Sequence, residues 1–208
     1  MILFFGDSFT SGENNNFNGY VEKLDLKDVK NFGVSGTCIG DYSLYPVYQN
    51  NLVQLLDKEK ESIKKADTIF LEYGSNDISS IICGYTSVNV VLIDFVKCLD
   101  YIRQLNSNCK IYFLTLGENV NTFASGQIEY LKNDYLKSIS NLVFSASDNL
   151  KLKWISLYDE FISYVKNMEL EMIEFPKFGE DELDKDGLHP NDKGYSKIAN
   201  TIIKHITN

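Results

Sequence analysis

The chain has 208 residues, of which 44% are hydrophobic, and a formal net charge of −9. This length suits a single domain, predicted over residues 1–208, with a sizeable core. The negative charge argues against nucleic acid or an anionic membrane as the main partner, because binding to phosphates needs an excess of Lys and Arg. No apolar stretch has the length needed to span a bilayer.

The start of the chain and its cysteines favour a cytoplasmic protein. Residues 1–5 are apolar, but they lack the basic flank and the cleavage region of a signal peptide. The cysteines are too few for a disulfide scaffold of this size and show no paired spacing typical of zinc sites. We predict buried free thiols, with a reactive nucleophile as the alternative, at Cys38, Cys83, Cys98 and Cys109.

Five short runs rich in β-branched and aromatic residues are predicted to form strands. In chain order they are Ile2–Phe5, Val29–Phe32, Thr68–Tyr73, Lys110–Leu116 and Lys151–Leu157. Each is followed by Gly, Asn, Asp or Ser, which are typical of loops. The runs are apolar on both sides, as is usual for strands of a parallel sheet that is covered on both faces.

Helical repeats alternate with these strands. Apolar residues spaced three and four apart predict helices over 88–102, 128–143 and 195–206, and a further helix is predicted over 47–63. The alternation predicts an α/β fold, a three-layer α/β/α sandwich around a five-stranded parallel sheet. Ligands bind at the carboxyl ends of the strands in such folds, so the loops that follow the strands are expected to carry the chemistry.

Two of these loops offer residues suited to nucleophilic catalysis. Ser8 follows the first strand directly, after a glycine that permits a sharp turn. Asp186 and His189, three residues apart, precede the last helix, where the carboxylate can meet one imidazole nitrogen and leave the other to accept a proton. The alternatives are an ordinary strand-to-helix turn and a structural histidine. The second histidine, His205, is predicted to be a surface residue of the terminal helix.

Two further loops offer hydrogen-bond donors. A glycine in the loop 31–37 could present its N–H to a developing negative oxygen. The spacing of Gly33, Gly36 and Gly40 does not match the G-x-G-x-x-G motif of dinucleotide-binding proteins. The loop that contains these glycines also does not follow the first strand, so both features argue against dinucleotide binding. Asn76, just after the third predicted strand, could donate into the same space; the alternative is an Asx-turn that ends the strand.

These four segments, in this order, resemble the blocks of the SGNH (GDSL-like) hydrolase superfamily: Gly6-Asp7-Ser8, the loop with Gly36, Gly74-Ser75-Asn76-Asp77, and Asp186-x-x-His189. The resemblance implies a flavodoxin-like fold and a catalytic triad of Ser8, Asp186 and His189. It also implies an oxyanion hole made by Ser8, Gly36 and Asn76, and hydrolysis without a metal or cofactor. Phe9 replaces the common leucine at a position that varies within the superfamily.

The expected function is therefore hydrolysis of a carboxylic ester or thioester through an acyl-enzyme intermediate. Both small-molecule or carbohydrate esters and lipid acyl chains fit as substrates. Acyl transfer to an alcohol by the same residues and a binding module with a vestigial site are the alternatives, and the oligomeric state is not predicted. The segment 158–185 is interpreted as packing plus a solvated loop, or as a cap over the site that binds an acyl chain.

Overall fold

The computed structural model describes residues 1–44, 51–131, 147–168 and 170–207. Within these ranges one parallel sheet is built from β1 (Ile2–Gly6), β2 (Val29–Gly33), β3 (Thr68–Glu72), β4 (Lys110–Thr115) and β5 (Glu171–Glu174). The strand order is β2-β1-β3-β4-β5. After β1, the chain adds β2 on one side of it and then β3, β4 and β5 on the other. This reversal places a topological switch point between β1 and β3.

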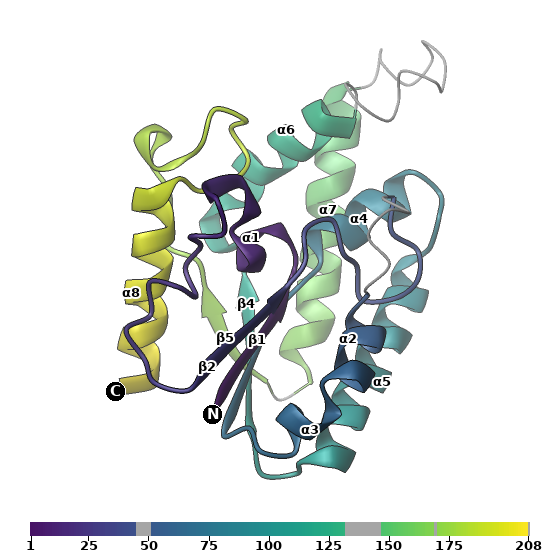
Figure 1. The fold of residues 1–208 in the computed structure, drawn as a ribbon. Coiled ribbons are helices and arrows are strands. Elements are labelled where there is room, and N and C mark those ends of the chain that lie inside the picture. Colours follow the sequence, from purple (N-terminus) through teal and green to yellow (C-terminus); the bar gives the residue numbers. More distant parts are fainter. Residues whose placement is uncertain (45–50, 132–146, 169, 208) are drawn as a thin grey trace.

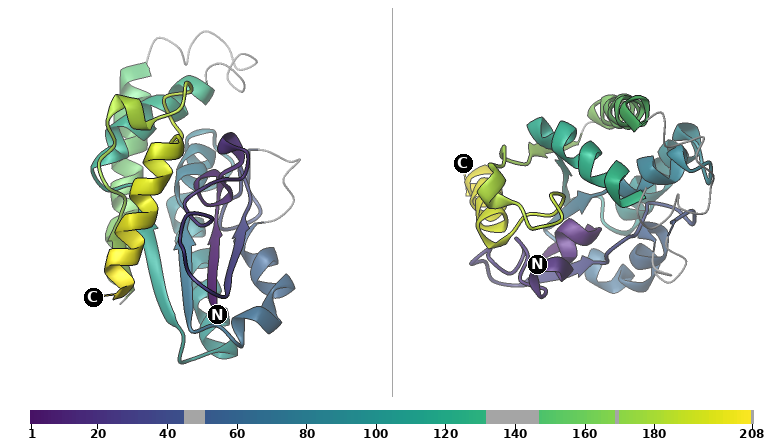
Figure 2. Two further views of the ribbon diagram at one scale, coloured as in Figure 1. Left: turned by 60° about the vertical axis from the view of Figure 1, so that its left-hand side comes forward. Right: turned by 90° about the horizontal axis from the view of Figure 1, so that it is seen from above.

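Helices cover both faces of this sheet. They are α1 (Ser8–Ser11), α2 (Leu52–Lys58), α3 (Lys60–Ile63), α4 (Ser75–Ile82), α5 (Val88–Leu105), α6 (Val120–Tyr130), α7 (Ser147–Lys166) and α8 (Asp192–Thr207), with short 3-10 turns η1 (Glu13–Asn15), η2 (Gly117–Asn119) and η6 (Glu180–Glu182). Helices α2, α3, α5 and α7 lie along one face and α8 along the other (Figure 1 and Figure 2). The predicted three-layer fold is confirmed.

Aromatic residues in register hold the strands together on the face toward α8. Phe4, Phe70 and Tyr112 are cross-strand neighbours on β1, β3 and β4. Their rings stack with centroid separations of 4.4 Å and 4.9 Å. Such pairs combine burial of apolar area with favourable ring geometry. The ladder fixes the relative positions of the strands whose ends carry the site.

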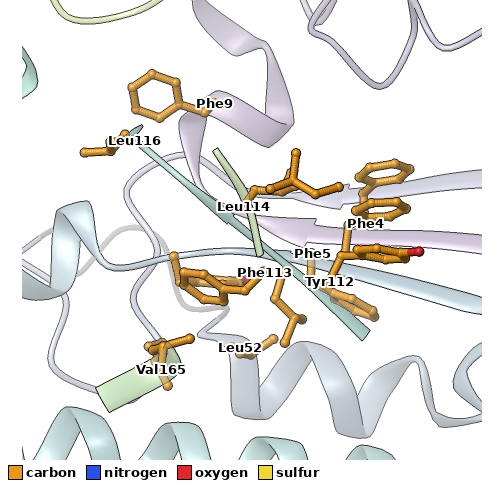
Figure 3. Packing of buried hydrophobic residues seen from close by; sticks show 14 of the residues in the cluster. Phe4, Phe5, Phe9, Leu52, Tyr112, Phe113, Leu114, Leu116 and Val165 are labelled. Atoms are coloured by element: carbon orange, nitrogen blue, oxygen red, sulfur yellow. The ribbon is translucent and has the colours of Figure 1, made fainter. Parts of the chain in front are cut away.

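The opposite face packs on the helices through a second aromatic group. Phe113 on β4 meets Phe95 of α5 and Phe161 of α7 edge-on, at 5.4 Å and 6.0 Å between centroids. Figure 3 shows Phe113 facing Leu52 and Val165 from the same helical layer. All five residues are almost fully buried.

The fifth predicted strand is wrong, because residues 151–157 lie inside α7. The buried residues of α7 are Trp154, Tyr158, Phe161, Ile162 and Val165, which recur at helical spacing, whereas Leu152 is 64% exposed. The short window that favoured a strand covers only the first of these buried positions. The helical period becomes visible only when the next two turns are included.

The strand at that edge of the sheet is β5, inside the segment interpreted above as packing or a cap. Ile173 is the buried residue of this strand, and two glutamates form its ends. Phe175, just after it, is also buried and contacts Tyr20 at 6.2 Å between ring centroids. Residues 171–175 belong to the core of the fold, so this part of the segment is not a cap over the site.

The remaining element predictions have mixed outcomes. Helices α5 and α8 confirm two of the predicted repeats. The predicted helix over 47–63 is split into α2 and α3, and residues 47–50 lie outside the described residues. The repeat over 128–143 overlaps only the end of α6, since 132–146 also lie outside them. All four cysteines are free; Cys83 alone is partly exposed.

Candidate active site

The serine predicted as the nucleophile stands where β1 ends. Helix α1 begins at Ser8, and Asp7 caps it because its Oδ1 accepts a hydrogen bond of 3.0 Å from the N–H of Phe9. Gly6 permits the tight turn, since a Cβ at this position would collide with the side chain of Thr10. The hydroxyl of Ser8 is thereby held at the carboxyl end of a central strand.

The predicted base lies in a loop that closes on itself. Oδ1 of Asp186 accepts hydrogen bonds from the N–H groups of Leu188 and His189, at 2.8 Å and 2.9 Å. Gly187 between them has a φ of 64°, in the left-handed region that glycine adopts most readily. The N–H of Asp184 donates to the carbonyl of His189 at 2.8 Å. The local sequence therefore fixes the direction of the imidazole.

Neighbouring helices hold this loop in place. Asn191 caps α8, because its Oδ1 accepts a hydrogen bond of 2.9 Å from the N–H of Lys193. Helix α6 approaches from the other side at Gly126, where a Cβ would lie only 3.0 Å from the Cβ of Leu188. A larger residue there would push the loop and the helix apart.

The structure brings the three predicted triad side chains together. Nε2 of His189 lies 2.8 Å from Oγ of Ser8, which is 181 residues away in the sequence. Nδ1 of the same ring lies 2.6 Å from Oδ2 of Asp186. The His189 side chain is 17% exposed and that of Asp186 is 44% exposed, so the imidazole is largely shielded while the carboxylate reaches solvent.

The charge on Asp186 decides which nitrogen carries the proton. Partial burial raises the pKa of this carboxyl, but the hydrogen bond and charge of His189 and two backbone N–H donors outweigh it and lower the pKa to about 2. A carboxylate that is ionised at neutral pH can only accept, so Nδ1 carries the hydrogen. Nε2 of the neutral ring then has its lone pair directed at the Ser8 hydroxyl.

A pocket of about 270 Å³ opens beside Ser8 and His189. It is lined by Ser8, Glu13, Asn14, Ser35, Gly36, Asn76, Gln127, Tyr130, Leu188 and His189. Across the described residues, the backbone N–H groups of Ser8 and Gly36 have no hydrogen-bond acceptor. Gly36 has a φ of 73°, which favours glycine at this position. The pocket therefore presents two backbone donors next to the Ser8 hydroxyl.

Asn76, the third predicted donor, also lines the pocket, but its amide is already engaged. Its Nδ2 donates to Oδ2 of Asp7 at 3.0 Å and to the carbonyl of Thr37 at 3.2 Å. These two acceptors account for both of its N–H bonds. To donate to a substrate oxygen, Asn76 would have to share or give up one of these two hydrogen bonds.

Phe9 has a contact that the sequence did not indicate. Its ring lies against the imidazole of His189, at 5.2 Å between centroids, and against Phe123 at 4.9 Å. Phe9 is 1% exposed. The residue after the serine thus packs on the predicted base, while the serine itself hydrogen-bonds to it.

A pair of buried carboxyl groups lies beneath the nucleophile turn. Oε2 of Glu72, at the end of β3, accepts hydrogen bonds from Oγ1 of Thr10 at 3.2 Å and from the N–H of Asp7 at 3.3 Å. Burial, followed by the charge of Asp7, raises the pKa of Glu72 well above its usual value. Burial also raises the pKa of Asp7. The raised pKa favours the protonated form of Glu72, which still supports the turn as a hydrogen-bond acceptor.

Neither a metal-binding cluster nor a membrane-spanning helix occurs in the described part of the chain. No three His, Cys, Asp or Glu side chains there are grouped so that they could hold a metal ion. The described helices also include none with the length and apolar character needed to cross a bilayer.

Comparison with protein families gives a match over almost the whole chain. Residues 2–202 match the family described as GDSL-like Lipase/Acylhydrolase. The chain is also 25% identical over 229 residues to the uncharacterized protein YpmR of Bacillus subtilis (strain 168), covering 99% of this chain and 81% of that protein.

Solved structures with the same fold carry both lipase and esterase names. The lipase Lip_vut3 from a goat rumen metagenome superposes with a TM-score of 0.60 at 17% identity, over 98% of this chain and 95% of that one. Est24, a carbohydrate acetylesterase from Sinorhizobium meliloti, superposes with a TM-score of 0.59 at 12% identity, over 99% and 97%. At these identities the likeness concerns the fold.

Proposed function

Because the chain belongs to the family of GDSL-like lipases and acylhydrolases and is an ester hydrolase, we propose that Ser8, His189 and Asp186 form its catalytic triad. The observation that carries this proposal is the unbroken contact from Oγ of Ser8 through His189 to Oδ2 of Asp186. A serine hydroxyl becomes nucleophilic at neutral pH only when a base accepts its proton and an acceptor orients that base.

In the first half of the reaction, Oγ of Ser8 attacks the ester carbonyl while Nε2 of His189 takes the hydroxyl proton. The C–O bond of the tetrahedral intermediate breaks, and His189 passes that proton to the leaving alcohol. In the second half, water attacks the acyl-enzyme, gives a proton to His189 and releases the acid as Ser8 is reprotonated. Asp186 stays ionised throughout and stabilises the imidazolium.

The negative oxygen of each tetrahedral intermediate needs fixed donors. We assign this role to the N–H groups of Ser8 and Gly36, because both residues line the pocket and neither N–H has another acceptor among the described residues. Asn76 is the third donor of the proposal and shares one N–H between Asp7 and the oxyanion. Loss of one such donor commonly costs about 3–4 kcal/mol of barrier.

The pocket favours esters with a small acyl group. A volume of about 270 Å³ lies just below the usual range for ligand pockets. Its lining includes the polar side chains of Glu13, Asn14 and Ser35. These features support short acyl groups over long lipid chains. The named relatives include both a lipase and a carbohydrate acetylesterase, so the names alone do not favour either class.

A fluorophosphonate probe tests the proposed nucleophile. We expect covalent labelling of the native protein at Ser8, located by mass spectrometry, and no labelling of Ser8→Ala. In an ester hydrolysis assay, Ser8→Ala and His189→Ala should each lower kcat by at least about a thousandfold, and the double variant little further, because the residues act as a unit. Labelling at another residue, or full activity in Ser8→Ala, would disprove the assignment.

A further inference from the structure

A glutamine in the wall of the pocket is held in one orientation by buried neighbours. Gln127 lies on α6, lines the pocket beside Ser8 and His189, and is 6% exposed. Ordering a glutamine side chain costs conformational entropy, and burying its amide is unfavourable unless the polar atoms are paired. The partners of this amide therefore indicate what it does.

One end of the amide is anchored inside the protein. Oε1 of Gln127 accepts a hydrogen bond of 3.2 Å from Oγ of Ser79 on α4. Ser79 shares its single hydrogen with the carbonyl of Ser75 at 3.0 Å, and it accepts a hydrogen bond of 3.3 Å from the indole Nε1 of Trp154 on α7. Ser79 and Trp154 are 1% and 0% exposed, so this chain of contacts is fixed by the core.

The other end of the amide faces the pocket. Nε2 of Gln127 donates to no acceptor among the described residues, and it is not one of their fully enclosed unpaired atoms. Both of its N–H bonds are therefore available to a molecule that occupies the pocket. In this arrangement Oε1 is held by Ser79, so the amide presents its N–H groups and not its oxygen on the unpaired side.

Starting from the proposed function, we propose that Gln127 is a substrate-binding residue, whose amide donates a hydrogen bond to a hydroxyl or ether oxygen on the alcohol part of the ester. Glu13 lines the same pocket and supplies a polar group for a further hydroxyl. The amide of Asn14 already donates to the carbonyl of Pro190 and accepts from the hydroxyl of Tyr195. Tyr130, one turn further along α6, lines the pocket as well and is 41% exposed. The substrate class is thus a short-chain ester of a polyhydroxylated alcohol.

The experiment compares two acetate esters that differ only in the alcohol: 6-O-acetylglucose, which carries hydroxyl and ether oxygens, and phenyl acetate, which has none outside its ester group. The quantity measured is the ratio of kcat/KM for the first ester over the second. Gln127→Glu keeps an oxygen for Ser79 but replaces the N–H donors, and Gln127→Leu removes both. We expect this ratio to fall about tenfold or more in each variant, mainly through a higher KM for 6-O-acetylglucose.

Two controls keep the result interpretable. Gln104→Leu makes the same change at an exposed position of α5 and should leave the ratio unaltered. Thermal unfolding is measured for every variant, and Gln127→Met, which keeps the unbranched shape, replaces Gln127→Leu if the latter does not fold.

A ratio within about twofold of the native value in folded Gln127 variants would overturn the assignment, and so would equal losses on both esters. Such results would leave the proposed function intact as long as Ser8 is labelled. Failure of the proposed function would be seen differently, as a native protein that neither reacts with the probe at Ser8 nor hydrolyses either ester.

Discussion

The ring of Phe9 packs against the imidazole of His189, with 5.2 Å between their centroids. Phe9 directly follows Ser8, whose Oγ lies 2.8 Å from Nε2 of the same imidazole. Two consecutive residues of α1 therefore hold His189, one through a hydrogen bond and one through an apolar surface. The turn that presents the serine also limits the rotation of its predicted base.

Replacing Phe9 should therefore lower kcat by more than the loss of folding stability alone would. Phe9→Ala removes a buried ring and should destabilise the protein by about 3–5 kcal/mol, as is usual for such changes. It should also lower kcat, because the imidazole loses the surface against which it packs. Phe9→Leu keeps most of the volume and should retain most of kcat.

The matched control is Phe123→Ala, since the ring of Phe123 contacts Phe9 at 4.9 Å, whereas among the described ring pairs the imidazole of His189 contacts Phe9 and not Phe123. Both alanine variants are compared by denaturant unfolding and by steady-state kinetics at a temperature where both are folded. Equal losses of kcat in the two would mean that Phe9 acts only through the stability of the core.

Asn76→Ala should lower kcat by about two to three orders of magnitude with little change in KM, the pattern expected when a donor to the transition state is lost. The amide also contacts Asp7 and Thr37, so thermal unfolding must be followed in parallel. A change confined to KM, or a loss of kcat that disappears once the unfolded fraction is taken into account, would remove Asn76 from the oxyanion hole.

The sheet and the positions of the site residues could be predicted because their signals are local. A parallel strand that is buried on both sides reads as an apolar run, and the loop after each strand can be located from its Gly, Asn, Asp or Ser. The strand β5 has no such signal. It is an edge strand of four residues with glutamates at both ends, and only Ile173 in it is buried.

Contacts that depend on packing between distant elements were not predictable in the same way. Glu72 is an acidic residue within an apolar run, which was a visible sign of a buried polar role, but its partners Thr10 and Asp7 depend on strand pairing. Gln127 lies on the buried side of α6 between Phe123, Ala124 and Ile128. Its polarity among apolar neighbours was the available signal, and only the structure places it in the pocket wall.

The pH dependence of stability should change when Asp186 is neutralised. A carboxyl with a folded pKa of about 2 and an ordinary unfolded value near 3.8 stabilises the fold fully above pH 4, and this contribution is lost as the pH falls toward 2. The unfolding free energies of native protein and Asp186→Asn should therefore differ most above pH 4. The difference should shrink below it. A difference that stays constant from pH 6 to pH 2 would show that the His189 contact does not lower the pKa.

Glu72 should behave in the opposite sense, because its folded pKa is raised. The folded state keeps a proton that the unfolded chain releases above about pH 4, so the group makes the protein less stable as the pH rises above that value. Glu72→Gln keeps an oxygen acceptor for Thr10 and Asp7 without a titrating proton. It should leave stability at pH 5 within about 1 kcal/mol of the native value and reduce the decline toward pH 8.

Glu72→Leu is the informative counterpart, since it leaves the Thr10 hydroxyl and the Asp7 N–H buried without this acceptor. Thr10 keeps its hydrogen bond of 2.7 Å with the hydroxyl of Tyr20, but the N–H of Asp7 loses its acceptor. An unpaired buried group costs about 1–3 kcal/mol, so this variant should be less stable than Glu72→Gln at both pH values. Denaturant unfolding at pH 5 and pH 8 measures both effects. If Glu72→Gln were as unstable as Glu72→Leu, the turn beneath Ser8 would require an ionised carboxylate, contrary to the raised pKa of Glu72.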